Sequence, residues 1–296
     1  MEICRQICNP KIAQMKKLLL VASFALTLNV FAQKVGNELS FQKGQKLEMV
    51  VNVNSTVSQG MAGESKVQAT ITRIFDVNDV ANGSATIEHK LKRIQINFET
   101  PMMGSQTFDS EKESDMKSEQ GKQVEKAFKN KYSMTVDATG RVTGVKKDDD
   151  NPNTESKNED AISSMLSQFA GGMEVPKVGD KTDFTILPSK EVGKSDSWTD
   201  SANNIKAVYT VTNITDNEIT IDYTEDGKTD RKQEAMGMES SISSTDKSKG
   251  RIILDRKTGV LKSKTTTMIS DGVMEVMGQT VPINTNTTRT ITVKGS

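Results

Sequence analysis

Apolar residues recur at every second position in many stretches of this 296-residue chain. Leu47, Met49, Val51 and Val53 alternate with mostly polar neighbours, and the period of two returns at 67–71, 87–98, 208–214, 219–223, 252–254, 260–268, 273–277 and 291–293. Successive side chains of a β-strand point to opposite faces of a sheet, whereas helical side chains repeat every 3.6 residues. The pattern therefore predicts a mainly β fold.

Three segments recur in the same order. Residues 67–74 match 207–214, residues 85–88 match 219–222, and residues 134–142 match 252–260. Ordered self-similarity indicates a repeated unit, although Thr-rich hairpins also resemble one another for local reasons. We expect two tandem antiparallel β units, at 33–150 and 179–296, forming curved sheets or half-barrels with one or two short helices. Whether the units share one sheet stays open.

Two windows have helical periodicity instead. Ile162, Met165, Leu166 and Phe169 fall at i, i+3, i+4 and i+7, and glycines follow at 171 and 172. We predict a short amphipathic helix there, within a linker at 151–178. Residues 115–129 form a less regular helical pattern.

The amino terminus resembles a secretory signal. Lys16 and Lys17 precede an apolar stretch, and small residues stand three and one positions before Gln33. We expect residues 1–32 to be a signal peptide cleaved after Ala32, with translation starting at Met15. The apolar stretch is short for a membrane span. The predicted location is therefore periplasmic or secreted, without a membrane span after cleavage.

Charge and cysteine content narrow the partners. The chain carries 39 basic and 39 acidic residues, and the segment expected to be removed holds more bases than acids. The sequence therefore lacks the excess of basic residues that would indicate nucleic-acid binding, and we expect no nucleic-acid partner. Both cysteines, Cys4 and Cys8, precede Met15. We therefore expect neither disulfides nor thiol chemistry in the mature chain.

Catalytic motifs are missing from the sequence. His89 is the single histidine and lies within an alternating stretch. No Gly-x-Ser-x-Gly or Ser-x-x-Lys motif accompanies it, so we predict an ordinary strand position and no enzymatic activity. We assign no catalytic residue, no cofactor and no metal.

One loop approaches a calcium-binding pattern. Asp149, Asn151, Asn153 and Asp160 have the spacing of ligands in a twelve-residue loop, but Thr154 stands where that loop needs Gly. We favour a solvated linker.

Trp198 and the methionines are the candidate ligand-binding residues. Aromatic residues make up only 4% of the chain, while there are 15 methionines, whose flexible side chains adapt to irregular apolar ligands. The candidates are Trp198, Met236, Met238, Met268, Met274 and Met277. For each of them, core packing is the favoured interpretation and ligand contact is the alternative.

Several short motifs resemble those of an uncharacterised family of exported β-rich proteins of the Bacteroidota. They are the run 98–104 leading to Phe108-Asp109-Ser110, the Asp-x-x-Gly hairpins, Leu187-Pro188, Glu191-Val192-Gly193 and Asp196-Ser197-Trp198. Lys194-Ser195 departs from the pattern, because such proteins more often run Gly-Asp-Ser-Trp directly. The resemblance implies an envelope location and an architecture similar to lipoprotein carriers, and it supplies no catalytic residues.

These features predict a non-enzymatic exported binding or scaffold protein of the bacterial envelope. Its partner would be an unknown envelope component or an apolar ligand held in a curved sheet. The alternatives are a hydrolase that uses surface carboxylates and a structural protein that self-associates through sheet edges.

Overall fold

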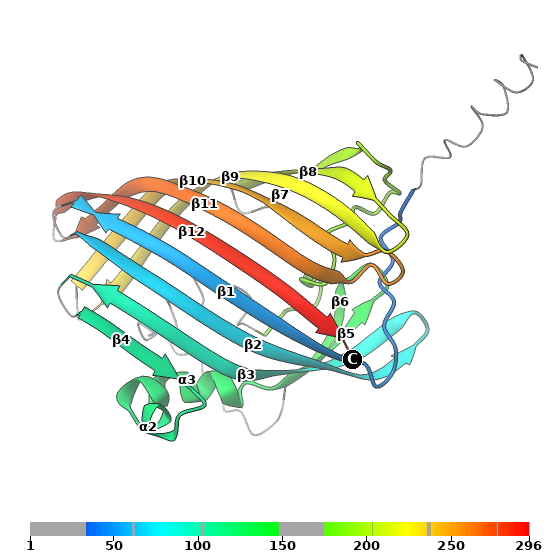
Figure 1. Ribbon diagram of the computed structural model, residues 1–296, viewed down its shortest axis with the longest axis horizontal. Coiled ribbons are helices and arrows are strands. Elements are labelled where there is room, and N and C mark those ends of the chain that lie inside the picture. Colours follow the sequence, from blue (N-terminus) through cyan, green and yellow to red (C-terminus); the bar gives the residue numbers. More distant parts are fainter. Residues whose placement is uncertain are drawn as a thin grey trace, which may run out of the picture. The chain divides into compact units, whose positions relative to one another are not determined.

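The computed structural model describes residues 34–60, 63–101, 104–147, 175–202, 204–235, 238–276 and 278–295 (Figure 1). Contacts divide the chain into Met1–Lys34 and Val35–Ser296, and the elements described below belong to the second unit. Within the described residues, twelve strands form one open antiparallel sheet, accompanied by two short helices. The predicted mainly β class is confirmed.

The first half of the sheet comprises β1 (Lys46–Gln59), β2 (Glu64–Ala81), β3 (Ser84–Thr100), β4 (Gly104–Asp109), β5 (Tyr132–Asp137) and β6 (Val142–Lys147). The second half comprises β7 (Ser197–Ala202), β8 (Ile205–Ile214), β9 (Glu218–Ala235), β10 (Met238–Asp255), β11 (Leu261–Val276) and β12 (Gln279–Gly295). The helices are α2 (Glu113–Met116) and α3 (Glu119–Lys129), beside β3 and β4 (Figure 1).

One seam joins the two halves into a continuous sheet. The strand order is β6-β5-β3-β2-β1-β12-β11-β10-β9-β8-β7, and β4 pairs with the other end of β3. β1 and β12 pair from Leu47↔Gly295 to Gln59↔Ile283. Each half of the chain is therefore a contiguous block of strands. The two halves share one sheet, which the sequence alone did not decide.

The sheet has an inner face, defined here as the face that carries the buried side chains. Leu47, Met49, Val51 and Val53 of β1 are buried, while the residues between them are half-buried or exposed. The outer face carries Thr, Asn and charged side chains, including the exposed Arg251–Asp222 ion pair. The alternation seen in the sequence is thus the alternation of these two faces.

One end of the inner face is closed by a strap, defined as residues 35–41. The Leu39 N–H donates to the Ala138 carbonyl (2.6 Å), and the Ser40 N–H donates to the Thr258 carbonyl (2.9 Å). Ala138 follows β5 and Thr258 follows β10, so the strap binds the equivalent hairpin turn of each half. Leu39 of the strap and Phe184 are both buried in the apolar core.

The two halves share a pairing pattern. An extra residue interrupts β2 between Val77 and Asp79, and another interrupts β8 between Val211 and Asn213. Val77 faces Ile87 and Val211 faces Ile221, so 85–88 and 219–222 occupy equivalent positions, as their sequences suggest. The first sequence match is offset, because Val77 rather than Ile71 is equivalent to Val211.

Several boundaries differ from the sequence prediction. Residues 260–268 and 273–277 were expected as separate strands, but β11 is continuous from Leu261 to Val276. β9 and β10 extend far beyond 219–223 and 252–254. The helix at 115–129 is confirmed, with a break where Ser118 caps α3 by accepting a hydrogen bond from the Gly121 N–H (3.1 Å).

Three predictions fall outside the described residues: the signal peptide at 1–32, the helix around 162–169, and the loop from Asp149 to Asp160. In the part of the chain that the structure describes, no helix has the length and apolar character needed to cross a membrane.

Candidate binding face of the sheet

A cross-strand row on the inner face leads to the centre of the sheet. Its register runs through Trp198, Tyr209, Tyr223, Gly250, Thr266, Arg289 and Val53. The rings of Trp198 and Tyr209 stack at 5.3 Å, and those of Tyr209 and Tyr223 at 5.7 Å. Three aromatic side chains from the neighbouring strands β7, β8 and β9 thus form one ladder on the inner face.

Gly250 lets the last ring of this ladder cross β10. A Cβ at this position would lie 2.7 Å from Cε1 of Tyr223 and 2.8 Å from its hydroxyl oxygen. Without that obstacle, the Tyr223 hydroxyl reaches over β10 and hydrogen-bonds the Thr266 hydroxyl of β11. The Lys264 ammonium lies 4.8 Å from the centre of the same ring, within cation–π range.

Around Tyr223 lies the inner charged cluster, defined as Arg73, Asp183, Glu225, Lys264 and Arg289. Burial lowers the pKa of Lys264, which Glu225 and Asp183 partly counteract. Burial also lowers the pKa of Arg289, and the positive charge of Arg73 adds to that effect. The cluster therefore holds three basic and two acidic groups, and the surroundings of Lys264 and Arg289 disfavour their charged forms.

Within the described residues, neither Arg289 nor Lys264 has a carboxylate close by. Among the ion pairs of the described residues, no contact within 4.0 Å involves either side chain. The Nε of Arg289 is buried and lacks a hydrogen-bond partner in the described part of the chain. Buried donors are normally satisfied, so this atom is a candidate ligand contact.

Beyond the cluster, the inner face of β10 and β11 is half-buried, whereas Thr285 and Thr287 on the inner face of β12 are buried. Met268 and Met274 lie on the inner face of β11, and Met274 is flanked in register by Ile242 and Val281. Between them, the Asp246 carboxylate accepts hydrogen bonds from Thr229 (2.5 Å), Ser244 (3.0 Å) and Ser270.

The first half has a different ladder at the equivalent place. Tyr132 stacks on His89 at 4.6 Å, and Phe75 lies 5.0 Å from His89. Burial, reinforced by Arg73, lowers the pKa of His89 to about 4. Burial raises the pKa of Tyr132 and that of Tyr223 to about 12 each. His89 is therefore neutral at pH 7 and lies in the core.

The structure places the predicted ligand-binding residues in different positions. Trp198 is half-buried at the edge of the aromatic ladder, rather than fully plugged into the core or freely exposed. Met268 and Met274 share the inner face of β11. Met238 begins β10, whereas Met236 and Met277 fall outside the described residues.

Sequence reasoning missed the charged cluster, yet a signal was present. Arg73 is in phase with Ile71 and Phe75, so the period of two places it among core residues. Arg289 is likewise in phase with Ile291. A charged side chain at such an inward-facing position loses its hydration, which costs free energy. Apolar packing does not explain this cost, so the pattern indicates a polar or functional site.

The outer face carries a separate groove of about 470 Å³ over β1 to β4. Its polar lining includes Asn52, Gln68, Thr70 and Asn97. These side chains bond largely to one another, as in the contacts from Thr70 to Asn52 (2.9 Å) and from Asn97 to Gln68 (3.4 Å). The groove is a second concavity, and the charged residues in its lining are Asp109 and Lys112.

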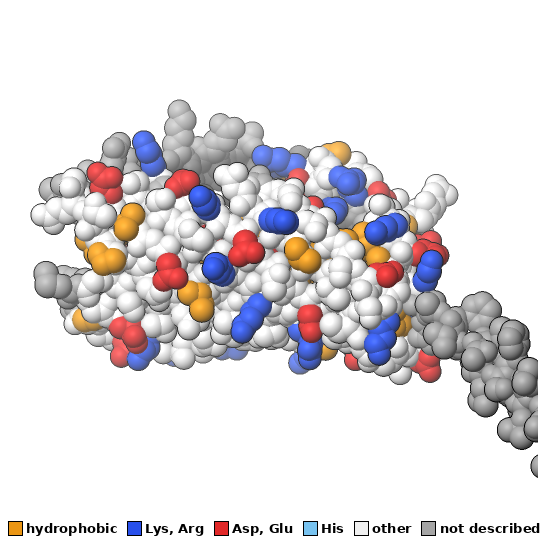
Figure 2. Space-filling view, turned by 90° about the horizontal axis from the view of Figure 1, so that it is seen from above, with side chains coloured by type: hydrophobic (Ala, Val, Ile, Leu, Met, Phe, Trp, Pro, Cys, Tyr) orange, Lys and Arg blue, Asp and Glu red, His pale blue; other side chains and the backbone are white. Residues whose placement is uncertain are grey.

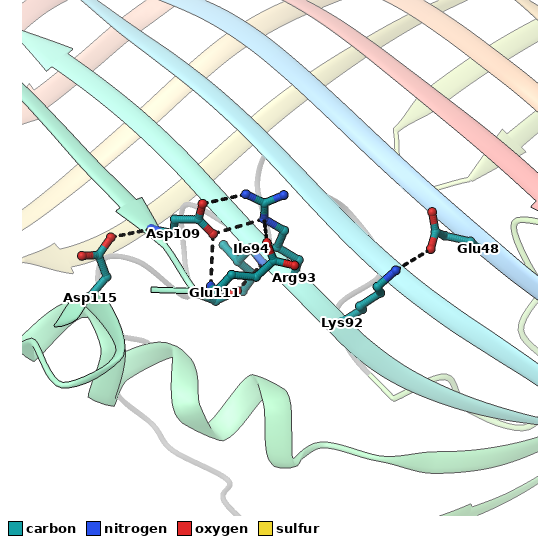
Figure 3. A network of polar contacts seen from close by, with 8 residues as sticks. Glu48, Lys92, Arg93, Ile94, Asp109, Glu111 and Asp115 are labelled. Atoms are coloured by element: carbon teal, nitrogen blue, oxygen red, sulfur yellow. Dashed lines mark hydrogen bonds and ion pairs between the residues drawn. The ribbon is translucent and has the colours of Figure 1, made fainter. Parts of the chain in front are cut away.

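An ion-pair network borders this groove and holds β4 against β3 (Figure 3). Arg93 contacts Asp109 through two hydrogen bonds of 3.1 and 2.6 Å, and Asp115 accepts from the Asp109 N–H (2.9 Å). The hydrogen bonds from Arg93 hold the pKa of Asp109 below its usual value. This network is explained by its structural role.

One further view of the surface concerns charge. On the face shown in Figure 2, basic and acidic side chains lie interspersed among polar atoms. In the described ranges, no group of three or more His, Cys, Asp or Glu side chains is arranged to hold a metal ion.

The model of a protein family described as "Family of unknown function (DUF6263)" matches residues 82–261, more than half of the chain. The chain belongs to this family. The match reaches from β3 into β11, so the family region includes parts of both halves and the aromatic ladder. No curated protein shows significant sequence similarity to the chain.

Among solved structures, one of lipovitellin that concerns lipid–protein interactions matches with a TM-score of 0.50 and 10% sequence identity. The match covers 87% of this chain but only 26% of lipovitellin, so the chain spans about a quarter of that protein. An outer membrane channel from Pseudomonas putida F1 is 8% identical, with 88% of this chain and 98% of the channel covered. Its TM-score of 0.25 supports no argument about fold.

Proposed function

We propose that this protein is a non-enzymatic binding protein that holds a ligand with an apolar part on the inner face of its sheet. The observation that carries the proposal is the contrast along that face. One end is a closed apolar core, whereas Met268, Met274, Ile242 and Val281 at the other end stay half-buried. Large apolar side chains that keep part of their surface in water are typical of a ligand surface.

Two further features support this reading. The fold is similar to that of lipovitellin, whose solved structure concerns lipid–protein interactions. The methionines can adjust to chains of different shape. The proposal also retains the expected envelope setting, periplasmic or secreted, with an envelope component as the source or recipient of the ligand.

Native mass spectrometry of the protein purified gently from its own host tests the proposal. We expect a mass above that of the chain alone, with the excess lost on denaturation and identified as an amphipathic molecule. A bare chain that also fails to take up added oleate would contradict the proposal.

Self-association is the second candidate function. Among the described strands, β6 and β7 lie at the two ends of the strand order, and each pairs with one neighbouring strand. The start of β6 also bonds residues 179–180 through the backbone of Val142, so β7 has the more open edge. Open edges of this kind can pair with another chain. The same mass spectrum would show a discrete dimer, and proline substitutions in β7 that abolish it would assign the contact to that edge.

A further inference from the structure

We propose that Arg289 and Lys264 bind the carboxylate head group of an amphipathic ligand whose hydrocarbon chain lies along the inner face of β11 and β12. The inference rests on the proposed function, and it adds the chemistry of the head group and the direction in which the ligand lies.

The first argument is the lack of local compensation. Arg289 and Lys264 are neighbours on the inner face, since Arg289 pairs with Thr266 and Lys264 with Ile291. Neither side chain has a carboxylate within 4.0 Å among the described residues, and the Arg289 Nε lacks a partner there. Removing a charge from water without pairing it costs free energy that good packing does not return. An incoming anion would supply the missing partner.

The second argument is the balance of charge. Asp183 and Glu225 act on both cations from a distance, while Arg73 adds a third positive charge. His89, which also faces Arg73, is neutral at pH 7. Within the described residues, these acidic groups therefore influence Arg289 and Lys264 only from a distance, which leaves both cations able to bind one anionic group.

The third argument is access. Asp183 is exposed to solvent, although it is close enough to influence Lys264, Arg289 and Tyr132. Its neighbour Phe184 is fully buried in the core. Solvent therefore reaches a position beside the cluster, at the border between the closed core and the half-buried part of the inner face.

The fourth argument is direction. Asp246 lies farther along the face, already carries three hydroxyl donors, and would repel an anionic head group. The head group therefore belongs at Arg289, with the chain extending toward Met274 and Val281. Six residues separate Arg289 from Ile283 on β12, a span of roughly 20 Å at about 3.4 Å per residue. Thr287 and Thr285 on this span of β12 are buried, so the acyl chain would follow the neighbouring half-buried residues of β11, over Met268.

The test is calorimetric titration of the purified full chain with oleate and with oleyl alcohol, below the concentrations at which they aggregate. The two probes share a hydrocarbon chain and differ in the carboxylate. A charge-assisted contact predicts that oleate binds about tenfold to hundredfold more tightly. The double variant Arg289→Gln with Lys264→Gln should abolish this preference and leave the affinity for oleyl alcohol unchanged.

A matched control is Lys262→Gln on the same strand. Lys262 is exposed and pairs with Glu218 at 2.6 Å, so its loss removes a charge from β11 without touching the cluster. This variant should keep the full preference for oleate. An equal loss in the control would overturn the assignment, because the effect would then follow net charge.

The remaining outcomes separate the two proposals. Equal binding of oleate and oleyl alcohol to the native chain would overturn the head-group site and leave the proposed function standing. Binding of neither would overturn both. Acetate that competes with oleate at equal concentration would overturn the link between head group and chain.

Stability supplies an independent readout. Because Arg289 and Lys264 lack close carboxylate partners among the residues that the structure describes, the ligand-free double variant should unfold at the same temperature as the native chain or at a higher one. A clear fall in its unfolding temperature would assign the pair a structural role and overturn the inference.

Discussion

The two halves of the sheet use one pairing pattern to build different interiors. In the first half, the ladder of Phe75, His89 and Tyr132 joins the aliphatic residues in a closed core. In the second half, the ladder of Trp198, Tyr209 and Tyr223 ends beside charged groups, and the face beyond is half-buried. Backbone pairing therefore fixes the sheet, while the inner side chains decide whether a stretch serves as core or as a surface for binding.

The largest expected effect comes from truncating equivalent core residues. Ile87→Ala and Ile221→Ala each remove a side chain that is completely buried, which typically costs about 2–5 kcal/mol of unfolding free energy. Because the β1–β12 seam joins the halves, both variants should shift one common transition in urea. The exposed Ile269→Ala should change little. Two separate transitions would show that the halves unfold independently.

A pH effect should belong to the first half alone. The pKa of His89 falls from 6.5 in the unfolded chain to about 4 in the folded protein. The contribution of neutral His89 to the free energy of unfolding is therefore fully present above pH 6.5. It is lost as the pH drops toward 4, by about 3 kcal/mol at roughly 1.4 kcal/mol per pKa unit. Tyr223 occupies the equivalent position in the second half and does not titrate in this range.

Urea unfolding of the native chain and of His89→Phe, measured between pH 7 and pH 4, isolates this effect. Carboxylates contribute to both proteins, so the difference between the two curves reports the histidine. Parallel curves would contradict the assignment of a buried, neutral His89.

Alanine substitutions of the turn glycines allow the two sites where the strap binds to be compared. Gly140 and Gly259 both have positive φ, which costs another residue about 1–2 kcal/mol. A Cβ at Gly259 would also lie 2.5 Å from the backbone oxygen of Glu38, whereas at Gly140 it meets the Thr185 methyl group at 2.6 Å. Gly259→Ala should thus destabilise more than Gly140→Ala in thermal unfolding. Gly83→Ala, with φ +74° and open space around it, measures the strain alone.

The smallest effects concern the outer ion pairs. Arg93 contacts the mostly buried Asp109, whereas Arg251 contacts Asp222 with both side chains well exposed. Screening by water weakens the second pair more. Arg93→Met should lower the unfolding temperature slightly and loosen β4 in hydrogen exchange, while Arg251→Met should leave both unchanged. The opposite order would mean that the contacts of β4 do not depend on Arg93.

How much of this fold could be predicted depends on the residue pattern of each stretch. Leu47 to Val53 alternate cleanly, so the core portion of β1 was found from sequence. The distal parts of β9 and β10 were missed because their inner positions carry Gly227, Thr229, Ser244 and Asp246, which hide the apolar period of two. A strand whose buried face is polar leaves no hydrophobic signal.

The candidate site was less predictable than the fold. Methionines drew attention because they are frequent, and Met268 and Met274 do share the inner face. Arg289 and Lys264 became meaningful only through the seam, which places β12 beside β11 and β1. Pairing between strands far apart in the sequence cannot be derived from local patterns.

The seam also determines the order in which the sheet can form. Leu47 pairs with Gly295, so β1 can form hydrogen bonds along its second edge only after β12 has been synthesised. Contacts between such distant residues form slowly, because a long loop must close first. On the ribosome, β1 and β2 can form a hairpin early, but the sheet is completed only after the whole chain has emerged. Any partner that guards the exposed edge of β1 during synthesis would therefore act before β12 arrives.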